Sequence, residues 1–362
     1  MPMQRPLYLS LLSALQAEKP YQNRSDAMSW IKYCSTLFIS IIVASCTVSP
    51  VSVPEATVRS QGVTLSPSPT ETSTPIPSVL PVLTPSPTSE TIASAPGLPV
   101  GEIIFTSYRD GNAEIYSIRA DGSDLRRLTD TPADEVSPRI SPDGQKIVFV
   151  SNQDGNNEIY LMGADGSGRI NLTNNLAEDV DPTWSPDGSQ IAFASLRDGN
   201  FHIWIMRIDD LAPMVLTHGT DVDLAPVWSP DGKQIAFLRI TTAGRFIHRI
   251  TIGDSFSERV PNVPPDVGHL AWSPDQQKIA FTSKKDGNSE IYIINTDGTD
   301  LIRVTKNGAD DFSPAWSLDG HFLVLSSKRQ DNLDLYIVNI VDGNEFRLTD
   351  NPAPDVSPSW IP

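Results

Sequence analysis

Acidic side chains recur at two fixed places in residues 101–362. The ring acids lead into the first strand of a repeated unit and are Glu135, Asp179, Asp223, Asp266, Asp311 and Asp355, with Asp266 one residue out of register. The turn acids begin Asp-Gly-Asn sequences and are Asp110, Asp154, Asp198 and Asp286. Carboxylates that converge on one opening focus negative potential, which attracts a cation or a basic peptide. We therefore predict that these ten side chains bind a partner at a common channel mouth.

A structural role is the alternative for both sets. Aspartate can bond to nearby backbone N–H groups and cap its own loop, and Asp-Gly-Asn forms a hairpin turn without any ligand. Asp-Gly-Asn-x-Glu, as at 110–114, is similar to the start of an EF-hand loop, but a strand follows where the later ligands would stand. We expect no cofactor and no metal site, and a divalent cation at the channel mouth is the alternative.

Residues for catalysis are not grouped in this sequence. The histidines fall in different positions of the repeat and are His202, His218, His248, His269 and His321, of which only His269 lies near a first strand. A Gly-x-Ser-x-Gly nucleophile elbow is absent. No catalytic residue is therefore predicted, and a non-catalytic binding module is favoured. The alternative is a metal-dependent propeller enzyme, similar to a polysaccharide lyase, that acts on an extracellular glycan.

The elements that would position these side chains belong to six copies of one unit. Equivalent residues stand 44 apart at Phe105, Phe149, Phe193, Phe237, Phe281 and Leu325. Each copy holds a Ser-Pro-Asp-Gly turn or its remnant, an apolar strand, a second turn and an alternating strand such as 114–116. Repeats of this length with four strand signals are typical of propeller blades. The sequence predicts an all-β, six-bladed propeller with four-stranded antiparallel blades.

Closure of the ring is predicted from the two ends of the repeat region. The first copy has no Ser-Pro-Asp-Gly turn before Ile103, whereas 357–362 match the innermost strand of a seventh copy. The C-terminal strand should therefore pair with blade one, which leaves no free sheet edge at the join. One tryptophan per copy, in five copies, should pack between blades, and lining a sugar-binding channel is the alternative.

The repeat resembles the TolB-type, WD40-like propeller repeat over essentially all of 101–362. The resemblance implies a propeller without built-in catalysis, of the kind found in bacterial envelope proteins, which binds a partner lipoprotein at its tunnel mouth. Family members also carry an α/β domain before the propeller. The segment before Gly101 does not match such a domain, so functions linked to that domain are not carried over.

Charge restricts the classes of partner. The chain has 27 basic and 44 acidic side chains and a net charge of −17, all of which belongs to the propeller because residues 1–100 hold five of each sign. Nucleic acid and anionic lipid headgroups are therefore excluded as expected partners. We expect an envelope protein or a basic peptide segment as the partner, and a monomer.

The first hundred residues have the features of an exported lipoprotein. Residues 28–46 read as a signal peptide, with an apolar run at 33–45 that is too short to span a bilayer. Its end, Val43-Ala44-Ser45-Cys46, resembles a lipobox, which makes Cys46 the predicted lipidation site; an uncleaved anchor or a simple secretory signal is the alternative.

Residues 1–27 are interpreted as a mis-called upstream segment. In 47–100, 30 of 54 residues are Ser, Thr or Pro, which predicts a disordered stalk. We expect a membrane attachment by lipid only, on the periplasmic or extracellular side.

Overall fold

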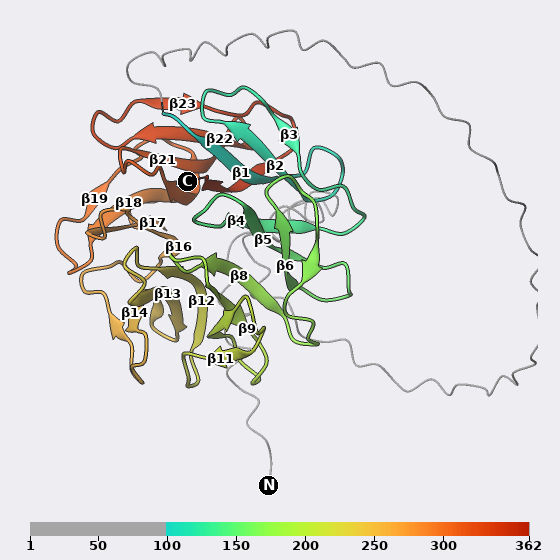
Figure 1. The fold of residues 1–362 in the computed structure, drawn as a ribbon. Helices are drawn as coiled ribbons and strands as arrows, with labels where there is room; N and C mark the ends of the chain where they lie inside the picture. The colour runs from blue at the N-terminus through green and yellow to red at the C-terminus, as the bar shows by residue number, and fades with distance from the viewer. Residues whose placement is uncertain (1–98, 362) are drawn as a thin grey trace, which may run out of the picture. The chain divides into compact units, whose positions relative to one another are not determined.

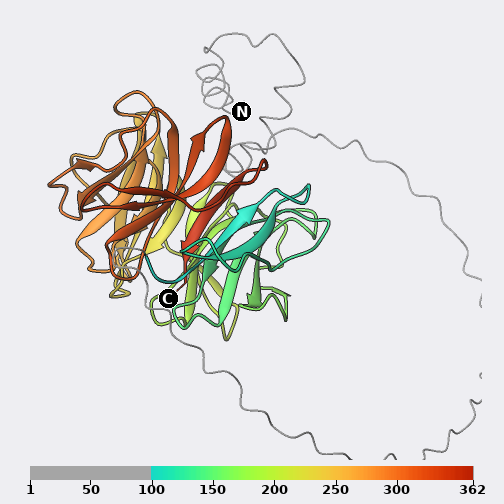
Figure 2. The same cartoon turned by 90° about the horizontal axis from the view of Figure 1, so that it is seen from above.

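A computed structural model describes residues 99–361 as a ring of six antiparallel four-stranded sheets (Figure 1). The segments 1–27 and 28–46, and all but the last two residues of 47–100, lie outside the described residues. Within 99–361 the regular elements are all strands, so the predicted all-β, six-bladed fold is confirmed. The ring surrounds a central axis, and the view turned by 90° shows the sheets stacked side by side around it (Figure 2).

The blades are numbered along the chain, and each is given from its innermost to its outermost strand. Blade one is β24 (Asp355–Trp360), β1 (Glu102–Ser107), β2 (Glu114–Arg119) and β3 (Arg126–Arg127). Blade two is β4 (Glu135–Ile140), β5 (Lys146–Ser151), β6 (Glu158–Gly163) and β7 (Ile170–Asn171). Blade three is β8 (Asp179–Trp184), β9 (Gln190–Ser195), β10 (His202–Arg207) and β11 (Pro213–Val215).

The remaining three blades continue the ring. Blade four is β12 (Val222–Trp228), β13 (Gln234–Thr241), β14 (Gly244–Thr251) and β15 (Glu258–Arg259). Blade five is β16 (Gly268–Trp272), β17 (Lys278–Ser283), β18 (Glu290–Asn295) and β19 (Ile302–Arg303). Blade six is β20 (Asp310–Trp316), β21 (Phe322–Arg329), β22 (Asn332–Asn339) and β23 (Glu345–Arg347). The outermost strands have only two or three residues, which keeps the exposed edges short.

The predicted ring closure is confirmed. β24 pairs antiparallel with β1, with Trp360 opposite Ile103 and Asp355 opposite Ser107. The first blade is therefore made from two parts of the chain that lie about 250 residues apart, and β24 covers the inner edge of β1.

The core is divided into six apolar layers, one between each pair of neighbouring blades. The residues that define the 44-residue step are completely buried in these layers: Phe105, Phe149, Phe193, Phe237, Phe281 and Leu325. Burial of each such side chain stabilises the fold by about 1.5–3 kcal/mol. The middle strands are apolar on both faces because a neighbouring blade covers each face.

The Ser-Pro-Asp-Gly turn has a hydrogen-bonded form that recurs around the ring. In blade two, the Ser141 hydroxyl donates to Asp143 at 2.5 Å and accepts from the Lys146 N–H at 2.9 Å. Gly144 has φ +69°, a conformation that glycine adopts without strain. These turns connect the innermost strand to the second strand in blades two to six.

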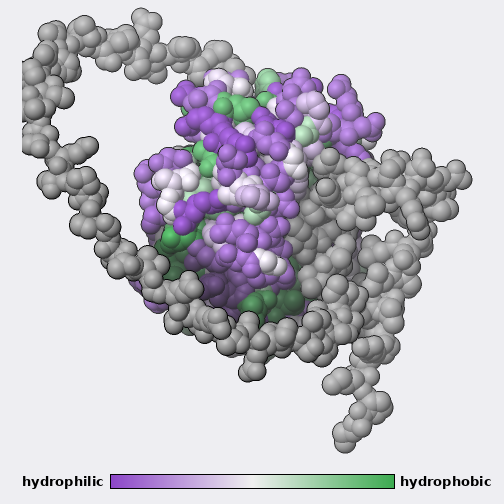
Figure 3. Space-filling model, turned by 90° about the vertical axis from the view of Figure 1, so that its right-hand side faces the viewer, coloured by the Kyte–Doolittle hydropathy of each residue, from purple (hydrophilic) through white to green (hydrophobic). Residues whose placement is uncertain are grey.

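Four of the tryptophans pack between blades as predicted and are at most 8% exposed: Trp184, Trp228, Trp316 and Trp360. The indole N–H groups of Trp184, Trp316 and Trp360 each donate to a backbone carbonyl of the preceding blade's inner strand at 3.0–3.1 Å. Trp272 differs because it is half-buried and donates to Gln276 in its own turn. The outer surface seen in Figure 3 is mostly hydrophilic with scattered apolar spots.

Candidate functional site

The ring acids are buried, with the exception of Asp266. Glu135, Asp179, Asp311 and Asp355 are 0% exposed and Asp223 is 1% exposed. The sequence placed these carboxylates at an open channel mouth, and in this respect the expectation was wrong. Their role in partner binding is not tested by burial alone and stays a prediction.

Arginine side chains neutralise four of the ring acids. Arg197 contacts Asp179 at 2.7 Å, Arg239 binds both oxygens of Asp223 at 2.7 and 2.8 Å, and Arg109 binds both oxygens of Asp355 at 3.1 Å. Glu135 is bound by Arg169. Each of these guanidinium groups also lies over the ring of its blade's buried phenylalanine, at 5.3–5.8 Å from the centroid. A buried carboxylate held in this way is a structural ion pair, and its charge is not available to focus a field outside.

The two other ring acids are held by neutral donors. Asp311 accepts from the Asn307 amide at 2.8 Å, and burial raises its pKa. Asp266 is half-buried and accepts from the Ser283 hydroxyl at 2.8 Å and the Lys284 N–H at 2.6 Å. Of the six ring acids, Asp266 alone lines the central cavity described below.

The turn acids are exposed, but each contacts the side chain of a neighbouring strand. Asp286 accepts from the Tyr292 hydroxyl at 2.6 Å, and Asp110 and Asp154 make the same contact with Tyr116 and Tyr160. Asp198 lies 3.7 Å from His202. The hydrogen bond from Tyr160 lowers the pKa of Asp154. These contacts fit the structural alternative for Asp-Gly-Asn, and a binding role for the turn acids stays a prediction.

A further set of buried acids explains the rest of the Asp-Gly-Asn-x-Glu motif. In blade five, Glu290 accepts from the Asn288 amide, the Thr305 hydroxyl and Arg303 at 2.5–2.9 Å. Asn288 also donates to Ala309 in the loop that leads into β20. In blades one, two, five and six, the asparagine and its acidic neighbour therefore join the outer hairpin to the loop that leads into the next blade. Glu114, Glu158 and Asp334 hold the equivalent positions. These residues stand at multiples of 44 in the sequence, and this spacing is the signal that could have found them.

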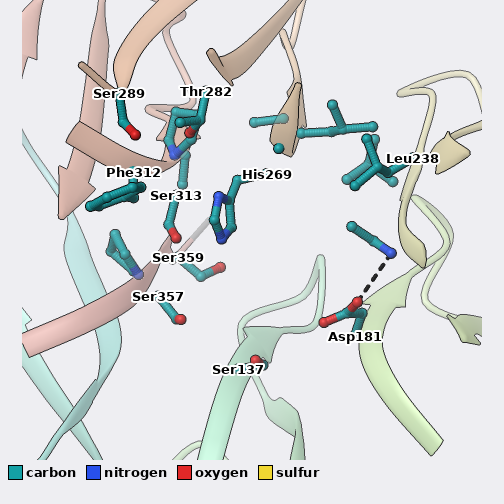
Figure 4. Close-up of a pocket in the computed structure, with 18 of the residues that line it drawn as sticks. Ser137, Asp181, Leu238, His269, Thr282, Ser289, Phe312, Ser313, Ser357 and Ser359 are labelled. Carbon is teal, nitrogen blue, oxygen red and sulfur yellow. Dashed lines mark hydrogen bonds between the residues drawn. The ribbon is translucent and has the colours of Figure 1, made fainter. Parts of the chain in front are cut away.

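The inner strands of all six blades surround a cavity of about 890 Å³ on the axis (Figure 4). Its wall includes one β-bulge per inner strand. The bulge residues stand 44 apart and have φ between +42° and +54°: Ser137, Asp181, Ala225, His269, Ser313 and Ser357. Positive φ is strained for residues other than glycine, and such strain is concentrated at functional sites. A proline follows five of the six, which is the sequence signal that would have found this ring.

The charges around the cavity are balanced. The cationic side chains are those of Arg139, Arg245, Lys284 and Lys328, and the anionic ones are those of Asp181, Asp266, Asp310 and Asp331. Two hairpins that are longer than the others, β13–β14 and β21–β22, bring Arg245, Lys328 and Asp331 to the wall. The cavity is therefore not the purely acidic funnel that the sequence suggested.

Besides Asp310 on β20, three charged or titratable residues of the inner strands line the cavity. An oxygen of Asp181 accepts from the Ala225 N–H at 3.1 Å, and burial raises the pKa of Asp181. The Arg139 guanidinium donates to the Pro138 carbonyl at 2.9 Å. His269 lies at an edge-on angle to Phe312, with ring centroids 6.3 Å apart. Burial, and then the positive charges of Arg139 and Arg245, lower the pKa of His269 to about 4. The imidazole is therefore neutral at pH 7.

The six blades and the cavity between them define a six-bladed β-propeller whose inner strands surround a central cavity. The family model described as the TolB beta propeller domain matches residues 129–242 and 201–362, which together exceed half of the chain. The chain belongs to this TolB β-propeller family.

Solved structures share the fold at low sequence identity. TolB from Acinetobacter baumannii is 22% identical with a TM-score of 0.67, over 72% of this chain and 67% of that one. A putative TolB from Agrobacterium tumefaciens is 20% identical with a TM-score of 0.58, over 73% and 99%. Hydrazine synthase from Kuenenia stuttgartiensis is 16% identical with a TM-score of 0.62, over 73% and 47%. No curated protein matches the sequence.

Residues 99–361 hold neither a metal-binding cluster nor a membrane-spanning helix. In this part of the chain, no group of three or more His, Cys, Asp or Glu side chains is arranged to hold a metal ion. The same residues include no helix that is long and apolar enough to cross a membrane. Cys46, the predicted lipidation site, lies outside the described residues.

Proposed function

We propose that this chain is a non-catalytic binding module of the cell envelope that holds a segment of a protein partner in its axial cavity. The observation that carries the proposal is the cavity of about 890 Å³ lined by all six inner strands. Its volume is in the range of ligand-binding sites. Its wall combines apolar surface with a few polar groups of different chemistry, which is the composition that gives a site specificity.

The balanced charges of the cavity wall suit a partner segment of either sign of charge. The prediction of a basic peptide at an acidic mouth has less support now, because four ring acids already have arginine partners. TolB structures at 20–22% identity support the fold alone, so the partner of those proteins is not carried over. The metal-dependent enzyme stays the alternative prediction, and no contact in residues 99–361 favours it.

Cross-linking in intact cells tests the proposed site. A photo-reactive amino acid is placed at Ser313, which lines the cavity, or at Ile302, which is 55% exposed on the outermost strand β19. We expect the Ser313 protein to form a discrete cross-linked product and the Ile302 protein not to form it. Equal products from both positions, or none from Ser313, would contradict binding in the cavity.

The envelope location rests on the sequence before the propeller. The apolar run, the Val43-Ala44-Ser45-Cys46 sequence and the Ser/Thr/Pro-rich segment support a lipid anchor followed by a spacer. Metabolic labelling with an alkyne fatty acid tests this. The full chain should incorporate the label and the Cys46→Ser variant should not; labelling of both proteins alike would place the lipid elsewhere.

A further inference from the structure

We infer that the cavity wall between blades four and five binds a carboxylate group of the segment that enters the channel. This inference rests on the proposed function and names the chemistry of its ligand. The site lies beside Ala225 on β12 and His269 on β16, with Arg139 and Arg245 as the nearby cationic side chains.

Asp181 shows how a carboxylate is held at a bulge. Its oxygen accepts from the backbone N–H of Ala225, the bulge residue of the next blade, at 3.1 Å. In the next pair of blades the two bulge residues are Ala225 and His269. Ala225 takes the place that Asp181 has in the preceding pair, and its side chain is only a methyl group. A carboxylate from a ligand can therefore occupy, beside Ala225, the position that the Asp181 carboxylate has in the preceding step.

Two cavity arginines form no close ion pair among the described residues, and the attraction of Arg139 to Asp181 acts over more than 4 Å. Within residues 99–361, neither Arg139 nor Arg245 forms an ion pair with a carboxylate within 4 Å, whereas the arginines beside the ring acids all do. Guanidinium groups bind carboxylates through strong charge-assisted hydrogen bonds. Arg139 and Arg245 are thus available to a ligand in a way that the structural arginines are not.

Unsatisfied polar atoms lie on the same wall. Nδ1 of His269 and Oγ1 of Thr282 have no hydrogen-bond partner among the described residues, and Thr282 is only 6% exposed. Figure 4 shows both residues at the cavity. A buried polar atom without a partner costs free energy, and a polar ligand that reaches it removes this cost.

The positive charges of Arg139 and Arg245 act at His269 and favour the binding of an anion there. Arg139 and Arg245 add to the effect of burial in lowering the pKa of His269 to about 4. The other charged groups around the cavity are Asp181, Asp266, Lys284, Asp310, Lys328 and Asp331. A carboxylate beside the imidazole would stabilise its protonated form, so the pKa of His269 reports on occupancy.

The test is an NMR titration of the full chain with labelled histidine, in which the His269 signal is assigned with His269→Gln. The probes are acetyl-glutamate amide for a side-chain carboxylate, acetyl-alanine for a C-terminal carboxylate, and acetyl-glutamine amide as the neutral control. At least one carboxylate probe should raise the pKa of His269 by about 1–3, and the tighter of the two identifies the source. Arg139→Gln should weaken that probe about tenfold or more. No response to either carboxylate, or an equal response to the amide, would overturn the inference.

Substitution of Ala225 gives an independent test with a matched control. Ala225→Asp supplies the carboxylate from the chain itself and Ala225→Asn supplies a neutral side chain of the same shape. Both residue types accept the φ of +49° at this position better than alanine, so both variants should fold. Ala225→Asp should raise the pKa of His269 and abolish the response to the probe, and Ala225→Asn should retain the response. If the two variants bind the probe equally, the inference is wrong.

Failure of this inference can be distinguished from failure of the proposed function. A cross-link from Ser313 in cells together with silent carboxylate probes would leave the binding module in place and remove its preference for a carboxylate. Absence of the cross-link would count against the module whatever the probes show.

Discussion

Removal of one ring carboxylate should destabilise the fold because its arginine is then left without an anion. Asp179 is fully buried, and Arg197, whose side chain is 14% exposed, contacts it at 2.7 Å. Breaking a buried ion pair by removing one partner costs about 3–5 kcal/mol. In Asp179→Asn the new amide still accepts one hydrogen bond, so we expect a cost at the lower end, about 2–4 kcal/mol.

Urea unfolding measures this cost. With a slope near 3 kcal/mol/M, the loss lowers the unfolding midpoint by about 1 M. The double variant Asp179→Asn with Arg197→Met should recover part of the stability, because an apolar side chain can replace a buried charge when its partner is also gone. Asp198→Asn is the control: this turn acid is exposed, and its change should stay within about 0.5 kcal/mol. The reasoning is refuted if Asp179→Asn unfolds at the wild-type midpoint, or if the double variant is less stable than Asp179→Asn.

Three further predictions concern the closure, the histidine and the hairpin network. Trp360→Ala should cost about 3–5 kcal/mol in thermal or urea unfolding, and Trp272→Ala, at a half-buried position, clearly less; equal losses would contradict the role of Trp360 in closure. Because the folded-state pKa of His269 is lowered from 6.5 to about 4, its contribution to stability is complete above pH 6.5 and is lost as the pH falls towards 4. His269→Gln should therefore lose less stability than wild type between pH 7 and pH 4, by at most about 3 kcal/mol, and parallel pH profiles would refute this. Asn288→Ala should cost about 1–3 kcal/mol by leaving Glu290 and the Ala309 carbonyl short of a donor, which hydrogen exchange near β20 should also detect as faster opening.

The sequence predicted the fold more completely than the site. The 44-residue step, the turn chemistry and the extra inner strand near the C-terminus each depend on local patterns, and the structure confirms all three, with the strand at Asp355–Trp360. The ring acids were placed in the correct register, but periodicity does not say whether a side chain faces solvent or a neighbour. Register would have found only two of the four arginine partners, because Arg109 and Arg197 share one position of the repeat whereas Arg169 and Arg239 come from two others.

The chemistry of the cavity wall comes from positions at which the copies of the repeat differ from one another. A repeat pattern does not show which of these differences matter for the site. Asp181, Ala225 and His269 hold the same position in successive copies with entirely different chemistry. The fourth copy has longer β13 and β14 strands, which bring Arg245 to the cavity. Strain at the bulge residues was also invisible without coordinates, although the repeated proline after them was a usable signal.

Because β24 pairs with β1, blade one is the last blade to be completed during synthesis. Blade one is incomplete until residues 355–360 have left the ribosome, so β1 carries an unpaired edge during almost the whole of translation. An open strand edge can recruit strands of other chains, so the unfinished chain is more exposed to wrong strand pairing than the closed ring is.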